Sequence, residues 1–133
     1  MVAYRRRKGA DMTRAVLLGC KGCGSAIAEI FLRLGEIPFD REEVDYNKAS
    51  TERDHLYDLN PLGQVPTVVL ANGFILTETL AIAHYVHRLK PNLGLIPDDL
   101  DNFLFFQRWS IFFIAALYPT FTYGDSPEKW VGT

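Results

Sequence analysis

The chain has 133 residues, of which 48% are hydrophobic and 23% are charged, and its formal net charge is −2. This length fits one domain, or one domain and a fragment of another, and the composition allows a sizeable buried core. The charge divides into +3 over residues 1–11 and −5 over the remainder, so nucleic acid is not expected as a partner of the folded part. No apolar run reaches the roughly 18 uncharged residues of a membrane helix, so we expect no membrane-spanning segment.

Residues 1–12 are predicted to form a disordered basic leader. Arg5 to Lys8 supply its charge, and no apolar run follows them, so the stretch is not a secretory signal. A nuclear or membrane address is an alternative, and a natural start at Met12 is a further hypothesis. Without an export signal, the two cysteines are expected in a reducing cytoplasm, where a close pair is catalytic, redox-active or incidental.

From residue 13 onward, the pattern predicts a strand, a helix, a second strand and a short helix. Residues 15–18 form an apolar run suited to a buried strand. A helix is expected to begin at Ser25 and to end at Gly35, a typical C-terminal cap. A second strand is expected to end near Val44, and Ser50 is expected to cap the short helix. The apolar face of the first helix is predicted to hold Ile27, Ile30, Phe31 and Leu34.

Residues 60–79 combine a turn, a constrained proline, a hairpin and a helix start. Asn60-Pro61 and Gly63 predict the turn. Pro66 directly precedes a β-branched run and has no N–H for a sheet, so it should lie at the start of a strand. Because X-Pro bonds in tight turns are the common place for cis peptides, we predict that the Val65–Pro66 bond is cis.

A β-hairpin and a third long helix follow this turn. Asn72-Gly73 lies between residues 67–70 and 74–76, and both central residues can adopt a positive φ, which indicates a two-residue hairpin. Thr77 or Glu78 is then expected to open a helix with apolar residues at helical spacing. The predicted order is therefore βαβ, a helix and ββα, an α/β fold in which the first two strands are parallel.

Residues 93–133 are predicted to form a linker and one further helix. From Leu100 onward, apolar residues occupy more than one face of this helix, so neighbouring groups must cover it. Pro119 is expected to end or kink the helix. We expect a homo-oligomer in which residues 103–118 form the contact.

The order of these motifs resembles the glutathione-binding half of the glutathione S-transferase family, a thioredoxin-like domain. The resemblance runs from about residue 13 to about residue 95. It rests on Asn-Pro-x-Gly-Gln-Val-Pro, the hairpin, and Leu-Thr-Glu-Thr-x-Ala-Ile, in that order and spacing. It implies a thioredoxin-like domain over residues 13–92, followed over residues 93–133 by the first helix of an incomplete all-α domain. In the family, further helices of that domain supply most of the apolar pocket for the second substrate.

The resemblance also implies how glutathione is held. The main chain at Val65, with Gln64 and Pro66 beside it, is expected to pair with the cysteinyl peptide, and Glu78 and Thr79 are expected to hold the γ-glutamyl end. Thr79 stands where the family usually has serine, which keeps the hydroxyl. Physical chemistry agrees, because a main chain without sheet partners can accept an extended peptide as an added strand. The N–H groups at a helix start favour a carboxylate.

The loop Cys20-Lys-Gly-Cys23-Gly-Ser25 is the candidate reactive group. It joins the first strand to the first helix, where free N–H groups and the helix dipole stabilise a thiolate. Cys23 lies closer to the helix start and is the first candidate nucleophile, with Cys20 as a resolving partner. In the family a hydroxyl donates to the glutathione thiolate here, which makes Ser25 the rival. Whether Cys20 and Cys23 pair is left open, and small residues chosen for packing are a further alternative.

The leading interpretation is a glutathione transferase-like enzyme, with glutathione as co-substrate and a small electrophile as the second substrate. An alternative is a glutathione-dependent thiol–disulfide oxidoreductase that uses Cys23 on a disulfide. A further alternative is a non-catalytic binding or assembly module on the same fold. No metal is expected, because zinc binding would need more ligands at compatible spacing.

Overall fold

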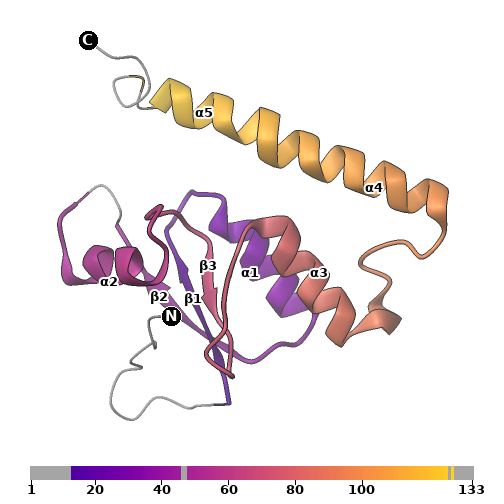
Figure 1. Cartoon of the computed structure of the whole chain (residues 1–133), viewed down its shortest axis with the longest axis horizontal. Helices are drawn as coiled ribbons and strands as arrows, with labels where there is room; N and C mark the ends of the chain where they lie inside the picture. The colour runs from indigo at the N-terminus through magenta and orange to yellow at the C-terminus, as the bar shows by residue number, and fades with distance from the viewer. Residues whose placement is uncertain (1–12, 46–47, 126, 128–133) are drawn as a thin grey trace. The chain divides into compact units, whose positions relative to one another are not determined.

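The computed structural model describes residues 13–45, 48–125 and 127 of the chain. The predicted leader, residues 1–12, lies outside these described residues. The backbone divides into two compact units, Met1–Leu93 and Gly94–Thr133, the first of which contains a sheet with helices (Figure 1). The elements of this first unit are β1 (Ala15–Gly19), α1 (Ser25–Leu34), β2 (Phe39–Glu43), α2 (Thr51–Leu59), β3 (Thr67–Val69), β4 (Ile75–Thr77), α3 (Thr79–Leu89) and a 3-10 turn at Pro91–Leu93.

The four strands form one sheet in the order β2-β1-β3-β4. β1 and β2 are parallel, whereas β3 is antiparallel to both of its neighbours. The α/β order predicted from the sequence is therefore confirmed. One row of cross-strand partners runs across the sheet close to the point where β1 and β4 end and β3 begins. This row consists of Glu42, Leu18, Thr67 and Thr77.

Apolar residues fill both faces of this sheet. Successive residues of a strand point to opposite faces, so Leu17 and Leu18 belong to different layers of the core. Leu17 and Val68 are fully buried, and strand alternation places them on the face opposite to Leu18 and Val69. The helices α1 and α3 cover one face of the sheet, and α2 lies on the other (Figure 1). The core on the α2 side consists of Val16, Leu18, Val44, Leu56, Leu59 and Val69.

The buried face of α1 differs from the one expected. The buried residues of α1 are Ser25, Ala28 and Leu32, whereas Ile30 and Leu34 are 54% and 52% exposed. The prediction that Ile30 and Leu34 belong to the buried face is therefore wrong. The end of α1 lies so close to α3 that a β-carbon on Gly35 would collide with Val86. We infer that small side chains are favoured where the two helices approach, which helical spacing alone does not reveal.

The hairpin between β3 and β4 has a three-residue loop rather than the predicted two-residue loop. The N–H of Gly73 donates to the carbonyl of Leu70 at 2.9 Å, and the N–H of Leu70 donates to the carbonyl of Phe74 at 2.8 Å. Gly73 has a φ of 84°, but Asn72 does not have a positive φ. Instead, the Asn72 side chain accepts a hydrogen bond from the Phe74 N–H at 3.0 Å. A tight turn followed by a glycine of positive φ is a common three-residue hairpin.

The second unit is a helical segment built from α4 (Leu100–Phe112), a π-helical stretch at Phe113–Leu117 and α5 (Tyr118–Asp125). Asp99 caps α4, because its carboxylate accepts a hydrogen bond from the Asn102 N–H at 3.0 Å. The helix does not end at Pro119 as one reading of the sequence expected. The wider π-helical stretch ends at Leu117, two positions before this proline, which has no N–H to donate to the preceding turn.

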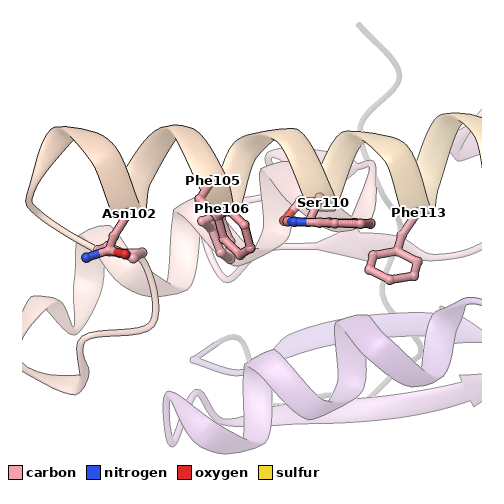
Figure 2. A pocket seen from close by; sticks show the side chains of 7 residues that line it. Asn102, Phe105, Phe106, Ser110 and Phe113 are labelled. Atoms are coloured by element: carbon pink, nitrogen blue, oxygen red, sulfur yellow. The ribbon is translucent and has the colours of Figure 1, made fainter.

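None of the described residues of α4 is buried from solvent. Asn102, Phe106 and Phe113 lie on the same side of the helix (Figure 2). They line a hollow of about 440 Å³ together with Pro97, Phe105, Trp109 and Ser110. Among the described helices, none combines the length and hydropathy that crossing a bilayer requires.

Candidate functional site

The predicted site residues lie in segments that adjoin one row of the sheet, the row that contains Leu18, Thr67 and Thr77. Leu18 pairs with Thr67, and Thr67 pairs with Thr77. Continuing the antiparallel register of β1 and β3 two residues past the Leu18–Thr67 pair brings Cys20 opposite Val65. Continuing from Thr77 leads directly to Glu78 and the start of α3. The fold thus gathers three segments that are distant in sequence at one end of the sheet.

The main-chain N–H and C=O of Val65 are the central feature of this end of the sheet. The Val65–Pro66 peptide bond is cis. Among the residues that the structure describes, neither the N–H nor the C=O of Val65 has a hydrogen-bond partner. The Val65 side chain packs against the core on the α2 side and anchors the segment. An anchored segment with free main-chain groups beside a sheet is suited to pairing with an extended peptide.

A small buried network that the sequence analysis did not foresee holds the loop before β3. The Asn60 side-chain amide donates to the carbonyl of Gln64 at 3.0 Å and to the hydroxyl of Thr67 at 3.2 Å. The Thr67 hydroxyl donates to the same Gln64 carbonyl at 2.8 Å. Asn60 also accepts a hydrogen bond from the Leu62 N–H at 3.1 Å. The signal in the sequence is an asparagine before the turn and a threonine at the start of the next strand.

Gln64 contributes to the site through its main chain. Its carbonyl points into this network, whereas the residue as a whole is exposed. Gly63, directly before it, has a φ of 60° and lies against the ring of Tyr57, which leaves no room for a β-carbon. The turn therefore needs glycine at this position for both conformation and space.

Glu78 occupies an unusual backbone conformation at the start of α3. Its φ of 66° and ψ of 120° lie outside the regions that residues with a β-carbon normally adopt. The Glu78 carbonyl accepts the hydrogen bond from the Ile82 N–H at 3.0 Å, but within the described part of the chain the Glu78 side chain does not cap the helix. The first N–H groups of α3, beginning at Thr79, therefore lack a capping side chain and favour an anion. Non-glycine residues in such conformations are concentrated at functional sites.

The cysteine loop lies between β1 and α1. Gly22 has a φ of 73° and turns the chain, and Gly24 precedes the first residue of α1. The α-carbons of Cys20 and Cys23 are 5.8 Å apart, and their sulfur atoms are in bonding contact as a disulfide. The sequence left this pairing open, and the structure makes it. Both cysteines are partly exposed, so an external thiol can reach the loop.

Ser25 is directed into the loop. The residue is 2% exposed, and its hydroxyl lies against Gly19, where a β-carbon would have no room. The hydroxyl accepts a hydrogen bond from the Cys20 N–H and donates to the Cys20 carbonyl, both at 3.2 Å. It also lies 3.0 Å from the sulfur of Cys23. This arrangement suits a residue that holds the loop and its second sulfur in place.

The described residues contain no group of three or more metal-ligating side chains of the His, Cys, Asp and Glu types. Two sulfurs, the main chain of Val65 and the start of α3 are the polar groups that lie at this end of the sheet. Helices on both faces of a mixed sheet, with a proline at the start of an antiparallel strand, define a thioredoxin-like domain.

Comparisons with known proteins agree with this class. The sequence profile of the glutathione S-transferase N-terminal domain matches residues 25–89. The chain is 42% identical over 113 residues to the uncharacterized GST-like protein YncG of Escherichia coli strain K12. These aligned residues make up 84% of this chain and 55% of that protein. The chain belongs to the glutathione S-transferase family, whose N-terminal domain it carries. It spans little more than half of the length of the Escherichia coli protein.

Solved structures share the fold. A glutathione transferase homolog from Sulfitobacter, with bound glutathione, superposes with a TM-score of 0.81 over 91% of this chain and 58% of that chain, at 24% identity. A bacterial beta class glutathione S-transferase of Sphingomonas chungbukensis superposes with a TM-score of 0.61 over 72% of this chain and 49% of that chain, at 34% identity. The thioredoxin-like fold followed by a helical region is common to all of them.

Proposed function

We propose that this protein binds glutathione at the end of the sheet formed by Val65, Glu78 and the cysteine loop. The observation that carries the proposal is the free main chain of Val65, next to the uncapped start of α3. One relative in fold was solved with bound glutathione, which supports the same ligand here. Glutathione is a short extended peptide with a carboxylate at each end, so it matches a strand-like edge beside a helix start.

In this proposal, the cysteinyl unit of glutathione pairs with the N–H and C=O of Val65, between Gln64 and Pro66. Glu78 and Thr79 hold the γ-glutamyl end at the start of α3, where the first N–H groups of the helix donate to its carboxylate. Each contact of a carboxylate with an exposed helix end contributes roughly 0.3–1 kcal/mol, so the main-chain pairing and the helix end must act together. The glutathione sulfur then points to the loop that Cys20 and Cys23 form.

The proposed reaction is attack of the glutathione thiolate on a small electrophile. A bond forms between sulfur and the electrophilic carbon, the leaving group departs with its electron pair, and the thiol proton passes to solvent. The start of α1, which adjoins the loop, contributes the positive end of its helix dipole, which stabilises a thiolate. Positioning of the tripeptide supplies the remaining advantage, because a bound thiolate reacts in an effectively unimolecular step.

A second candidate function is thiol–disulfide exchange, which the contact between the Cys20 and Cys23 sulfurs favours. The Cys23 thiolate attacks a mixed disulfide of glutathione, forms a bond to the glutathione sulfur and releases the other thiol. The Cys20 thiolate then displaces glutathione, which leaves the Cys20–Cys23 disulfide. Two further glutathione molecules reduce this disulfide and leave as glutathione disulfide, so the electrons balance.

The exposed apolar side chains of α4 support the proposal that a second copy of the chain covers residues 103–118 in a homo-oligomer. The cytoplasmic location is proposed on the sequence alone. A non-catalytic binding or assembly module on the same fold remains the alternative. Such a module would form the oligomer without binding glutathione. Light scattering and calorimetry on the same sample separate the two readings.

The deciding experiment is isothermal titration calorimetry with glutathione, followed by two assays on Cys23→Ser and Cys20→Ser. Conjugation of an aromatic halide and reduction of a glutathione mixed disulfide are measured on the same preparations. We expect micromolar to millimolar binding by the unmodified chain. Conjugation that survives Cys23→Ser, with exchange abolished, supports separate chemistries. The proposal fails if the chain neither binds glutathione nor gains thermal stability at millimolar concentrations of it.

A further inference from the structure

The carbonyl oxygen of Gln64 is the centre of the buried network in front of β3. It accepts one hydrogen bond from the Thr67 hydroxyl at 2.8 Å and another from the Asn60 amide at 3.0 Å. A carbonyl oxygen has two lone pairs, so both are engaged. Asn60 is 7% exposed and Thr67 is fully buried, so water cannot readily replace either donor. Removing a donor leaves a buried polar group without its partner, which is costly.

Because the peptide plane is rigid, the orientation of the Gln64 carbonyl also fixes the orientation of the Val65 N–H. The peptide bond between Gln64 and Val65 is not one of the cis bonds of the described chain, so it is trans. In a trans peptide, the C=O and N–H point in opposite directions. A Gln64 carbonyl directed toward Asn60 and Thr67 therefore directs the Val65 N–H away from them. This is the same N–H that has no partner among the described residues.

We propose that Asn60 and Thr67 are positioning residues that orient the Val65 N–H for hydrogen bonding to the main chain of a peptide ligand. The inference rests on the proposed function, in which that ligand is the cysteinyl unit of glutathione. Neither side chain touches the ligand. Both act through the Gln64 carbonyl, by holding one peptide plane in the orientation that binding requires. A donor that is oriented before binding avoids the entropy cost of ordering it on association.

Substitutions at Thr67 separate the hydroxyl from the shape of the side chain. Thr67→Val keeps the branched shape and removes the hydrogen bonds, whereas Thr67→Ser keeps the hydroxyl and removes a methyl group. We expect Thr67→Val to weaken glutathione binding by about tenfold, as measured by calorimetry. The free energy of a tenfold change in affinity is similar to the net free energy of one hydrogen bond. Thr67→Ser should remain within about twofold of the unmodified chain.

A second variant and a matched control distinguish a loss of glutathione binding from a loss of fold stability. Asn60→Asp keeps an oxygen for the Leu62 N–H but removes the donors to Gln64 and Thr67, so it should weaken binding as Thr67→Val does. Val68→Ala alters the next residue of β3, which is fully buried but points to the opposite face of the sheet. It should lower the melting temperature and leave the affinity for glutathione unchanged.

The amide resonance of Val65 supplies a direct readout. In a two-dimensional NMR titration, glutathione should shift this resonance downfield in the unmodified chain and in Thr67→Ser, but not in Thr67→Val. Equal affinities for the unmodified chain and Thr67→Val would overturn the positioning role and leave the proposed function intact. The same holds if Val68→Ala weakens binding as much as Thr67→Val. An unmodified chain that does not bind glutathione would overturn both.

Discussion

The hydroxyl oxygen of Ser25 lies 3.0 Å from the sulfur of Cys23 while it also holds the main chain of Cys20. One buried side chain thus connects both cysteines of the loop. The sequence offered Cys23 and Ser25 as rival candidates for the same reactive position, whereas these contacts give the two side chains different positions in the loop. Ser25 holds the loop, and the sulfur that it contacts is the one nearer to the helix start.

Ser25→Ala should slow the chemistry of Cys23 and destabilise the fold. The substitution removes a hydroxyl that can donate to the Cys23 thiolate, so we expect iodoacetamide to alkylate the reduced protein about three- to tenfold more slowly at neutral pH. Loss of the hydrogen bonds to Cys20 should lower the free energy of unfolding by about 1–3 kcal/mol.

The matched control for Ser25 is Ser50→Ala. Ser50 also accepts a hydrogen bond from a main-chain N–H, that of Arg53 at 3.1 Å, but it caps α2. Its removal should cost about 1 kcal/mol and leave the alkylation rate unchanged. An alkylation rate that is the same in Ser25→Ala and Ser50→Ala would contradict the contact between Ser25 and the thiolate.

Glu78→Gly should stabilise the fold while it weakens glutathione binding. A φ of 66° with a ψ of 120° is unfavourable for glutamate, and glycine removes this strain. After the greater entropy of unfolded glycine is subtracted, we expect a gain of roughly 0.5–2 kcal/mol in denaturant unfolding. Binding should weaken because the γ-glutamyl end loses the glutamate and the rigid approach to α3.

Glu36→Gly is the control for this prediction. Glu36 also has a positive φ, of 52°, but it lies between α1 and β2, away from the row that ends at Thr77. It should gain stability without any change in the affinity for glutathione. Unchanged affinity in both variants would remove Glu78 from the binding site.

Gly35→Ala should destabilise the packing of α1 on α3. The φ of Gly35 is −77°, which any residue adopts, so the need for glycine is one of space alone. An added methyl group would collide with Val86 and should cost about 1–3 kcal/mol. In a double-mutant cycle, Val86→Ala should cost less in the Gly35→Ala background than alone. Additive costs would show that the two residues do not interfere.

Asp99 should make the start of α4 sensitive to acid. Hydrogen bonds from the main chain and side chain of Asn102 lower the pKa of this carboxyl below its usual value of 3.8. A lowered pKa means that the cap stabilises the helix above the usual pKa and that this stabilisation is lost as the pH falls through the folded value. NMR titration of the carboxyl should give a midpoint below 3.8. In Asp99→Asn, which caps without a charge, the acid transition at Asn102 should disappear.

Much of the architecture could be predicted because its signals are local. The apolar run at β1, the capping serine at Ser50 and the turn before Pro66 each depend on neighbouring residues. The ordered motifs around Val65 and Glu78 were enough to indicate a glutathione S-transferase, and the comparisons confirm the family. Their roles in binding remain predictions.

The features that required the tertiary structure all depend on contacts between distant segments. Sequence periodicity could not show that Ile30 and Leu34 face outward, because the close approach of α1 to α3 decides which face is buried. Nor could it show that Ser25 turns inward.

The network of Asn60, Gln64 and Thr67 likewise exists only when the loop folds back on the start of β3. Which elements form, and in what order, follows from the amino-acid sequence alone, since backbone preference and hydrophobic spacing act over a few residues. Which polar groups are buried together, and which main-chain groups are left without a partner, depends instead on how the elements pack in three dimensions.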